Sequence, residues 1–339
     1  MMMRCTERII HSHLKSIGTA GYAVLLGIAM LAILLSACRA DSAEDVTRTL
    51  PHMTLVAPVH AEEQGDAIRL GAEAAAKEYG YQLDYISLES SDDAAEQLAA
   101  AMVALDKGTA AILIDPASEE VLQELSQHAQ QLDTPVIVLN DERMLPGVMA
   151  AIAINNNDAG RKAGQQLAEL LDQDGVVAIL RSDRADPDLI AREQGAKSVL
   201  GEMSGITLVD GAACGKREDA CWQAAKQLLD QGGIDGLLAL DIQASLGAAQ
   251  EVVRRKEQGE TKIVTFGSDL KQLQMLQDGI IHTLVVQNGF STGYLGIEQA
   301  VKVLDGWRYD KPVVLETKVI DADNMFWMDN QKVLFPFVK

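Results

Sequence analysis

The sequence predicts an α/β protein whose parallel sheets are covered by helices on both faces, a doubly wound fold. Two observations carry this prediction. From residue 53 onward, short apolar runs alternate with amphipathic segments of about ten to fifteen residues. The apolar runs are continuous in Val, Ile and Leu rather than alternating with polar residues, which is typical of strands buried on both faces.

The first series of elements ends at residue 141. Its strands are predicted at the apolar runs 53–59, 81–87, 110–117 and 135–141. Its helices are predicted where apolar residues recur at helical spacing, at 65–80, 92–108 and 118–133. Gly80 closes the first of these helices, as glycine often does just beyond a helix end.

A second series with the same alternation of strands and helices follows. Its helices are predicted at 155–175, 190–203, 221–232 and 242–256, the first with an Asn/Asp cap. Its strands are predicted at 176–182, 205–211, 236–241 and 262–269. Two similar units in tandem indicate two lobes.

The N-terminal segment has the layout of an export signal. Residues 16–37 carry no charge and follow a basic stretch, and the run ends in Leu-Ser-Ala-Cys at Cys38. This ending resembles the lipobox of bacterial lipoproteins, so we expect residues 1–37 to be a signal peptide and Cys38 to carry lipid. Residues 38–50 would then form an acidic linker to a lipid-anchored, extracytoplasmic protein. The alternative is a transmembrane anchor, since an uncharged run of this length could span roughly 30 Å as a helix.

The protein is strongly acidic, with a formal net charge of −20. Residues 1–37 carry three basic side chains and one acidic one, so their removal would take the charge from −20 to −22. Phosphate backbones would repel such a chain, which argues against nucleic acid as a partner.

The cysteines and histidines of the sequence indicate which disulfides and metal sites can form. Cys214 and Cys221 would be the cysteines left in the mature chain besides Cys38, and in an oxidising compartment we expect them to form a disulfide. Two free thiols are the alternative. The six histidines are scattered, so neither a metal site nor a cofactor is expected. No motif of a known catalytic class is present either.

Polar residues stand at the ends of the predicted strands. In open α/β sheets, ligands bind outside the carboxyl ends of the strands. The candidates in or just after those ends are His60, Asp115, Asn140, Asp141, Asp183, Asp241 and Asp269. They predict a polar ligand held between the two lobes.

The order of motifs resembles a known family. "AAILIDPAS", "TPVIVLND", "IAINNNDAGRKAG", "GLLALDIQASLGAAQ" and "LVVQNGFSTGYLGIEQAVKVLDG" occur in the order found in the periplasmic binding proteins of the ribose-binding type. The resemblance covers about residues 54–319. It implies the type I clamshell: two doubly wound parallel-sheet lobes joined by three crossovers, near residues 153–156, 286–290 and 316–320.

The resemblance also implies the lobe boundaries. The N-terminal lobe would take residues 51–154 and 288–318, and the C-terminal lobe residues 155–287 and 319–339. Closure of such lobes traps the ligand between them.

Ligand residues carry over only in part. Asp241 and Gln287 fall at positions that contact ligand in the family. The usual Asp-Arg pair after the fourth strand is replaced by Asn140 and Asp141, and Gln194 stands where an arginine commonly binds the sugar. Gly267 stands where the family has an aspartate that binds ligand, and Asp269 would take over its role. The loop of His60 lacks the paired aromatic residues that usually stack on the sugar.

The resemblance therefore implies a substrate-binding lipoprotein of an ABC importer, a monomer with no chemistry of its own. Its partners would be a sugar or polyol, the ABC permease and the membrane that holds the lipid. A cationic or amino-bearing ligand is the second choice, because the two expected arginines are absent and Asp141, Asp241 and Asp269 are candidates for the cleft. Two other functions stay open: a surface sensor that presents ligand to a membrane kinase or chemoreceptor, and a glycoside hydrolase that uses paired cleft acids.

Overall fold

The computed structural model of the protein describes residues 50–57, 62–88 and 94–335. The expected signal peptide, the lipid-bearing Cys38, nearly all of the acidic linker and His60 lie outside the described residues. Among the residues that the structure describes, no helix has both the length and the hydropathy needed to cross a membrane.

The first sheet is wholly parallel. Its strands lie in the order β12-β5-β4-β3-β1-β2. Their bounds are β1 His52–Ala57, β2 Gln82–Ser87, β3 Ile112–Ile114, β4 Val136–Leu139, β5 Val148–Ile154 and β12 Val313–Leu315. The strands β3 and β4 are buried throughout, as their unbroken apolar sequences predict.

The second sheet repeats this arrangement. Its strands lie in the order β13-β11-β10-β9-β6-β7, parallel except for the antiparallel edge strand β13, and β8 pairs with β6 off this path. Their bounds are β6 Gly175–Arg181, β7 Ile206–Leu208, β8 Ala212–Ala213, β9 Gly236–Ala239, β10 Lys262–Phe266, β11 Thr283–Val286 and β13 Lys318–Ile320.

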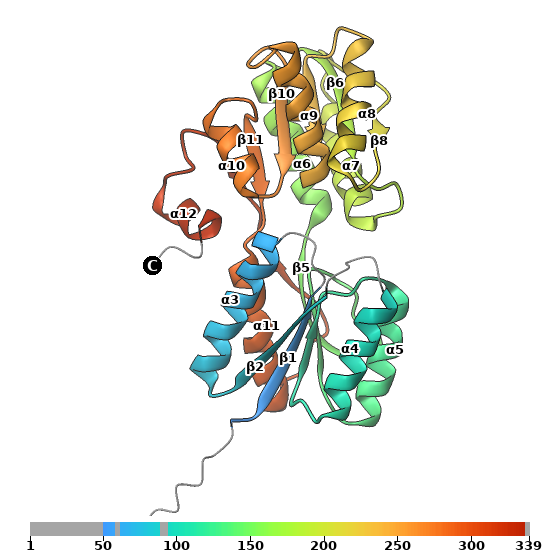
Figure 1. The fold of residues 1–339 in the computed structure, drawn as a ribbon, viewed down its shortest axis with the longest axis vertical. Helices are drawn as coiled ribbons and strands as arrows, with labels where there is room; N and C mark the ends of the chain where they lie inside the picture. The colour runs from blue at the N-terminus through green and yellow to red at the C-terminus, as the bar shows by residue number, and fades with distance from the viewer. Residues whose placement is uncertain (1–49, 58–61, 89–93, 336–339) are drawn as a thin grey trace, which may run out of the picture. The chain divides into compact units, whose positions relative to one another are not determined.

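Helices cover both faces of each sheet (Figure 1). On the first sheet they are α3 Glu62–Tyr79, α4 Ala94–Asp106, α5 Glu119–Gln131 and α11 Gly289–Leu304. On the second they are α6 Asn156–Leu170, α7 Pro187–Leu200, α8 Glu218–Asp230, α9 Ile242–Arg255, α10 Leu270–Gln277 and α12 Met328–Leu334.

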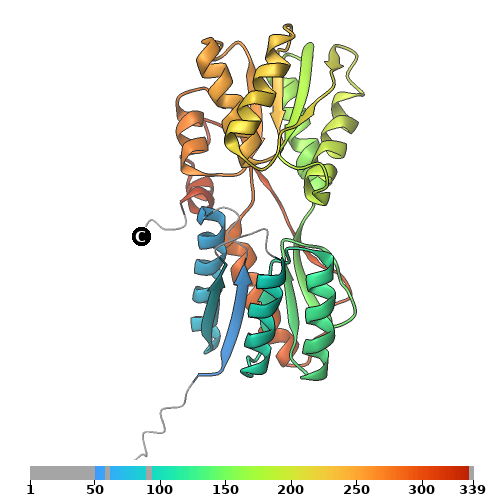
Figure 2. The same ribbon diagram turned by 45° about the vertical axis from the view of Figure 1, so that its right-hand side comes forward.

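Successive residues of a strand pack into hydrophobic cores on opposite faces of the sheet. In β3, Leu113 packs with α3 and α11, whereas Ile112 and Ile114 pack with α4 and α5. Figure 2 shows these two pairs of helices on the two sides of the sheet. The α/β, doubly wound, two-lobe fold predicted from the sequence is confirmed.

Each lobe also contains a helix pair packed through glycines on both helices. A Cβ at Gly71 of α3 would lie 2.0 Å from the Phe290 carbonyl oxygen of α11, and a Cβ at Gly293 would lie 1.8 Å from the Ile68 carbonyl oxygen. The second lobe repeats this contact between α6 and α7, through Gly160 and Gly195. Only a residue without a side chain allows helix backbones to approach so closely.

Three short segments connect the two sheets. Asn155 lies between β5 and α6, and residues 287–288 lie between β11 and α11. Residues 316–317 are all that separate β12 of the first sheet from β13 of the second.

Some boundaries differ from the sequence prediction. Strand β5 was not predicted, because its sequence VMAAIAI is rich in alanine and lacks the continuous branched residues of the other strands. Helix α7 begins at Pro187 instead of residue 190. Its start carries a cap, since the Asp186 side chain accepts hydrogen bonds from the backbone N–H groups of Asp188 and Leu189.

Candidate ligand-binding site

A cavity of about 900 Å³ lies where the carboxyl ends of strands from both sheets face each other. The first sheet and its loops contribute Asp115 after β3 and Asn140, Asp141 and Arg143 after β4. The second contributes Asp183 after β6, Asp188 and Arg192 of α7, and Lys216. Asn155 and Gln287, from two of the connecting segments, complete the polar wall.

The strand order explains this location. In each sheet the first strand in sequence lies between two later strands, β1 between β2 and β3, and β6 between β7 and β9. The winding direction therefore reverses beside β1 and beside β6. Crevices at such reversal points are where open α/β sheets bind ligands.

Asp115 and Asn140 form the floor of the first-lobe side. Asn140 donates from Nδ2 to Oδ2 of Asp115 at 2.7 Å, and its own Oδ1 is buried without a partner. The pKa of Asp115 is raised to about 7, chiefly by burial; the Asn140 hydrogen bond lowers it, and the negative charges of Asp188 and Asp141 raise it.

Asp141 binds an arginine two residues further on. Its Oδ1 accepts from the backbone N–H of Arg143 at 2.9 Å, and its Oδ2 accepts from Nε at 2.6 Å and from Nη2. Nη1 of Arg143 also lies 3.5 Å from a carboxylate oxygen of Glu119. The guanidinium is thus oriented by acidic groups of its own lobe.

Arg192 is held in place on the second-lobe side. It donates from Nε to Oδ1 of Asn156 at 2.8 Å and from Nη1 to the Leu240 carbonyl at 2.9 Å. Its guanidinium carbon lies 4.6 Å from the centre of the Phe266 ring, a cation–π contact. Burial lowers the Arg192 pKa, while the nearby carboxylate of Asp188 raises it.

Asp188 lies one helical turn before Arg192. Burial raises its pKa to about 6; Arg192 and Arg143 act in the opposite direction, and the carboxylates of Asp186 and Asp141 add to the increase. The cavity therefore favours the neutral, protonated form of one carboxyl group in each lobe, Asp115 and Asp188.

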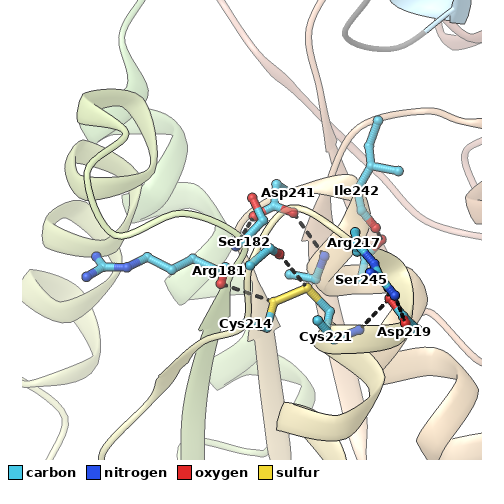
Figure 3. The surroundings of a disulfide bond; sticks show 12 residues. Arg181, Ser182, Cys214, Arg217, Asp219, Cys221, Asp241, Ile242 and Ser245 are labelled. Atoms are coloured by element: carbon cyan, nitrogen blue, oxygen red, sulfur yellow. Dashed lines mark hydrogen bonds and ion pairs between the residues drawn. A yellow bond between two sulfur atoms is a disulfide. The ribbon is translucent and has the colours of Figure 1, made fainter. Parts of the chain in front are cut away.

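A disulfide joins Cys214 to Cys221 (Figure 3) and closes the loop that carries the cavity residue Lys216. The backbone N–H of Cys214 donates to the Arg181 carbonyl and that of Gly215 to the Ser182 carbonyl, so the loop is tied to the end of β6. Nζ of Lys216 lies 3.9 Å from a carboxylate oxygen of Asp183. The disulfide thus fixes a loop that lines the cavity.

Five of the candidate residues named from the sequence line the cavity: Asp115, Asn140, Asp141, Asp183 and Gln287. Asp241 and Asp269 are not among the lining residues. Asp241 caps α9 through Oδ1 and accepts from the Ser182 N–H through Oδ2 at 2.7 Å, as Figure 3 shows. Asp269 caps α10 in a capping box with Gln272.

Gln194 is exposed and does not line the cavity. Two positions along a helix rotate a side chain by about 200°, so Arg192 faces the cavity where Gln194 faces away. Arg143 and Arg192 both line the cavity, so guanidinium groups are present there although neither stands at a position where the resemblance implies an arginine.

Phe266 is 2% exposed and belongs to the core, beneath Arg192. Phe290 and Tyr294 stack on one another in α11. Within the described part of the chain, no aromatic residue lines the cavity. In the same part, no cluster of three His, Cys, Asp or Glu residues could hold a metal ion.

Comparison with known proteins identifies the family to which this two-lobe architecture belongs. The profile of the periplasmic binding protein domain matches residues 54–307. The chain belongs to the periplasmic binding protein family. Its fold of two lobes around a polar cavity is that of a solute-binding protein rather than of an enzyme.

Two curated relatives of this periplasmic binding protein span most of its length. It is 25% identical over 307 residues to the ribose import binding protein of Haemophilus influenzae, covering 91% of this chain and 99% of that protein. It is 22% identical over 264 residues to the D-apiose import binding protein of Paraburkholderia graminis, covering 77% of this chain and 83% of that one.

Solved structures share the fold of this periplasmic binding protein. A carbohydrate transporter solute binding protein from Agrobacterium radiobacter, in complex with D-arabinose, matches with a TM-score of 0.76 at 20% identity, over 85% of this chain and 99% of that one. A glucose-galactose binding protein from Geobacillus stearothermophilus matches with a TM-score of 0.72 at 23% identity, over 81% and 99%.

Proposed function

We propose that this protein is an extracytoplasmic solute-binding lipoprotein that captures a small hydroxyl-rich ligand, a sugar or polyol, between its lobes and delivers it to an ABC permease. The observation that carries the proposal is a cavity lined from both lobes by hydrogen-bonding side chains. The import binding proteins for ribose and D-apiose, which it resembles over most of its length, support the ligand class.

The cavity offers both kinds of hydrogen-bonding partner that a hydroxyl group needs. Asn140, Asp141 and Asp183 supply acceptor oxygens, and Arg143, Arg192 and Lys216 supply donors. A hydroxyl both donates and accepts, so a ring of such groups matches a polyhydroxylated ligand.

Ligand capture would be coupled to lobe closure. A ligand that touches Asp141 on one side and Arg192 on the other stabilises the conformation in which both reach it. The short connecting segments, with Asn155 and Gln287 in the cavity wall, are the places where the backbone would bend.

A thermal-shift screen of the purified protein against pentoses, hexoses and polyols tests the proposal. A ligand that binds only the folded state stabilises it by about 2.7 kcal/mol at a hundredfold excess over Kd, which raises the melting temperature measurably. If no member of these classes raises it, the proposed ligand class is wrong.

The lipid anchor and the importer have separate tests. Wild-type protein should sediment with the membrane fraction, and a Cys38→Ala variant should lose its lipid by mass spectrometry. Delivery to a permease predicts that neighbouring genes encode a permease and an ATPase; a neighbouring histidine kinase would instead favour the sensor.

A further inference from the structure

We propose that the ligand of this cavity carries a protonated amine, so that an amino sugar binds in preference to the neutral sugar of the same configuration. The inference rests on the proposed function, because it names the ligand class for the same site. It follows from the charges, the unpartnered acceptor and the chemical character of the cavity wall.

The described lining residues carry an excess of negative charge. Seven carboxylates stand against three cationic side chains: Asp115, Glu119, Asp141, Glu142, Asp183, Asp186 and Asp188 against Arg143, Arg192 and Lys216. Arg143 is ion-paired with Asp141, whereas Arg192 donates to the uncharged Asn156 amide and Leu240 carbonyl and keeps its charge. Even with Asp115 and Asp188 neutral, the other five of the seven carboxylates face three cations, so the net charge of the wall is negative.

The excess is distributed across the cleft. Asp115 lies at the end of β3 in the first lobe, in the negative field of Asp188 and Asp141. Asp188 lies in the first turn of α7 in the second lobe, where the positive charge of Arg192 acts against the negative charges of Asp186 and Asp141. Approach of the lobes without a ligand brings these like charges together. An ammonium group between them would turn this repulsion into attraction, which couples closure to a cationic ligand.

Asn140 adds an acceptor that the protein leaves unused. Its Nδ2 is committed to Asp115, and its Oδ1 is buried with no donor. Buried polar atoms normally have a partner. An ammonium group has three N–H donors and no acceptor, so it fits a wall of carboxylates, and a shift of the Asn140 side chain would bring its buried Oδ1 within reach.

The wall offers little to a neutral sugar ring as a stacking surface. Among the described residues that line the cavity, the apolar ones are alanine, proline and isoleucine, and none is aromatic. Aromatic faces contribute apolar contact area that such rings use. Recognition here therefore depends on polar and charged contacts.

The raised pKa values of two cavity carboxyl groups make the preference for an amine-bearing ligand testable by pH. Asp115, whose pKa is raised to about 7, faces Asn140, Asp188 and Asp141. Asp188, whose pKa is raised to about 6, faces Arg192, Asp186, Asp141 and Arg143. As pH falls from 7 toward 5, both lose negative charge, so binding of an amine-bearing ligand should weaken while binding of its neutral parent should change less.

Calorimetric titration with matched ligands tests the inference. Each amino sugar, for example D-glucosamine or D-galactosamine, is compared near neutral pH with its neutral parent, its N-acetylated form and the corresponding uronic acid. We expect the amino sugar of one configuration to bind at least about tenfold tighter than its parent and its N-acetylated form.

The failures are distinguishable. A neutral sugar that binds as tightly as its amino form overturns this inference and leaves the proposed function standing. Tighter binding of a uronic acid also overturns it and assigns the dominant role to Arg143 and Arg192. If no sugar, polyol or amino sugar binds, the proposed function fails too.

A variant pair locates the effect. Asp188→Asn should lose most of the amino-sugar preference, about tenfold, while its affinity for the neutral parent changes far less. Asp310→Asn, which makes the same charge change at an exposed residue outside the cavity lining, should leave both affinities unchanged. Equal losses of both ligands in Asp188→Asn would overturn the inference. Circular dichroism and the melting temperature confirm that each variant is folded.

Discussion

Asn140 holds Asp115 by a side-chain hydrogen bond of 2.7 Å between neighbouring strand ends, and it does so from a left-handed backbone conformation with φ of 57°. Asparagine tolerates this conformation better than most residues with a Cβ. One residue thus shapes the turn after β4 and positions a cavity carboxylate.

This dual role predicts a difference between two truncations of Asn140. Asn140→Gly and Asn140→Ala both remove the hydrogen bond to Asp115, but alanine also adds strain at positive φ. We expect Asn140→Ala to be less stable than Asn140→Gly by about 1 kcal/mol in urea unfolding. Equal stabilities would show that the backbone at 140 relaxes to negative φ.

Asp115→Asn should stabilise the ligand-free protein at alkaline pH. The folded-state pKa of about 7 exceeds the model-peptide value of 3.8, so the folded state binds more protons between these values. Ionisation of Asp115 therefore reduces stability as pH rises through this window. Replacement by asparagine should add roughly 2 kcal/mol above pH 7 and little near pH 4. A gain independent of pH would contradict the assignment to this carboxyl.

Gln287→Ala should weaken ligand binding by about 1–3 kcal/mol, since Gln287 lines the cavity and a ligand hydroxyl would lose its partner. Isothermal titration measures the change. The unfolding free energy should change less, because Gln287 lies in a connecting segment.

Asp241→Ala should act through stability as well as affinity. It removes the cap of α9, at a cost of about 1 kcal/mol, and releases the Ser182 N–H next to the cavity residue Asp183. If Asp241→Ala and Gln287→Ala both leave affinity unchanged, the assigned site is wrong.

The two doubly wound lobes could be predicted because their signals are local. Continuous apolar runs such as Val136–Leu139 predict buried strands, and the rule that ligands bind at strand ends places Asn140, Asp141 and Asp183 in the cavity. Arg143 and Arg192 could not be placed in this way. Arg143 depends on a turn folded back by Asp141, and Arg192 on the rotational phase of a helix whose start was misplaced.

Asp241 and Asp269 illustrate an ambiguity of the same rule. An aspartate at a strand end is also the residue before the next helix, and capping is among its commonest roles there. The cap signal was readable in the sequence and gives the correct local contact for both residues.

Reduction of the disulfide should loosen the cavity rim. Removing the Cys214–Cys221 bridge from its short loop should cost roughly 2.5 kcal/mol of stability. It should also lower ligand affinity, because the loop carries Lys216 next to Asp183. The double variant Cys214→Ser/Cys221→Ser should match reduced wild type and show no response to reductant. Unchanged affinity would show that β8 and α8 alone hold the loop.

Close helix packing makes Gly293 intolerant of a methyl group. Gly293→Ala should destabilise the protein by about 1–3 kcal/mol, because the new Cβ would collide with the Ile68 carbonyl oxygen. Gly65→Ala in α3 is the control: its Cβ would lie 3.7 Å from the Tyr85 hydroxyl, an ordinary contact. A stable Gly293→Ala variant would mean that α3 and α11 separate readily.

The two residues between β12 and β13 restrict how the halves of the molecule can move. Even fully extended, this segment keeps the Cα atoms of Leu315 and Lys318 within about 11 Å of each other. The halves can turn about this point but cannot drift apart. Their relative motion is therefore mainly a rotation, and spectroscopic probes placed across the mouth of the cleft would follow its opening.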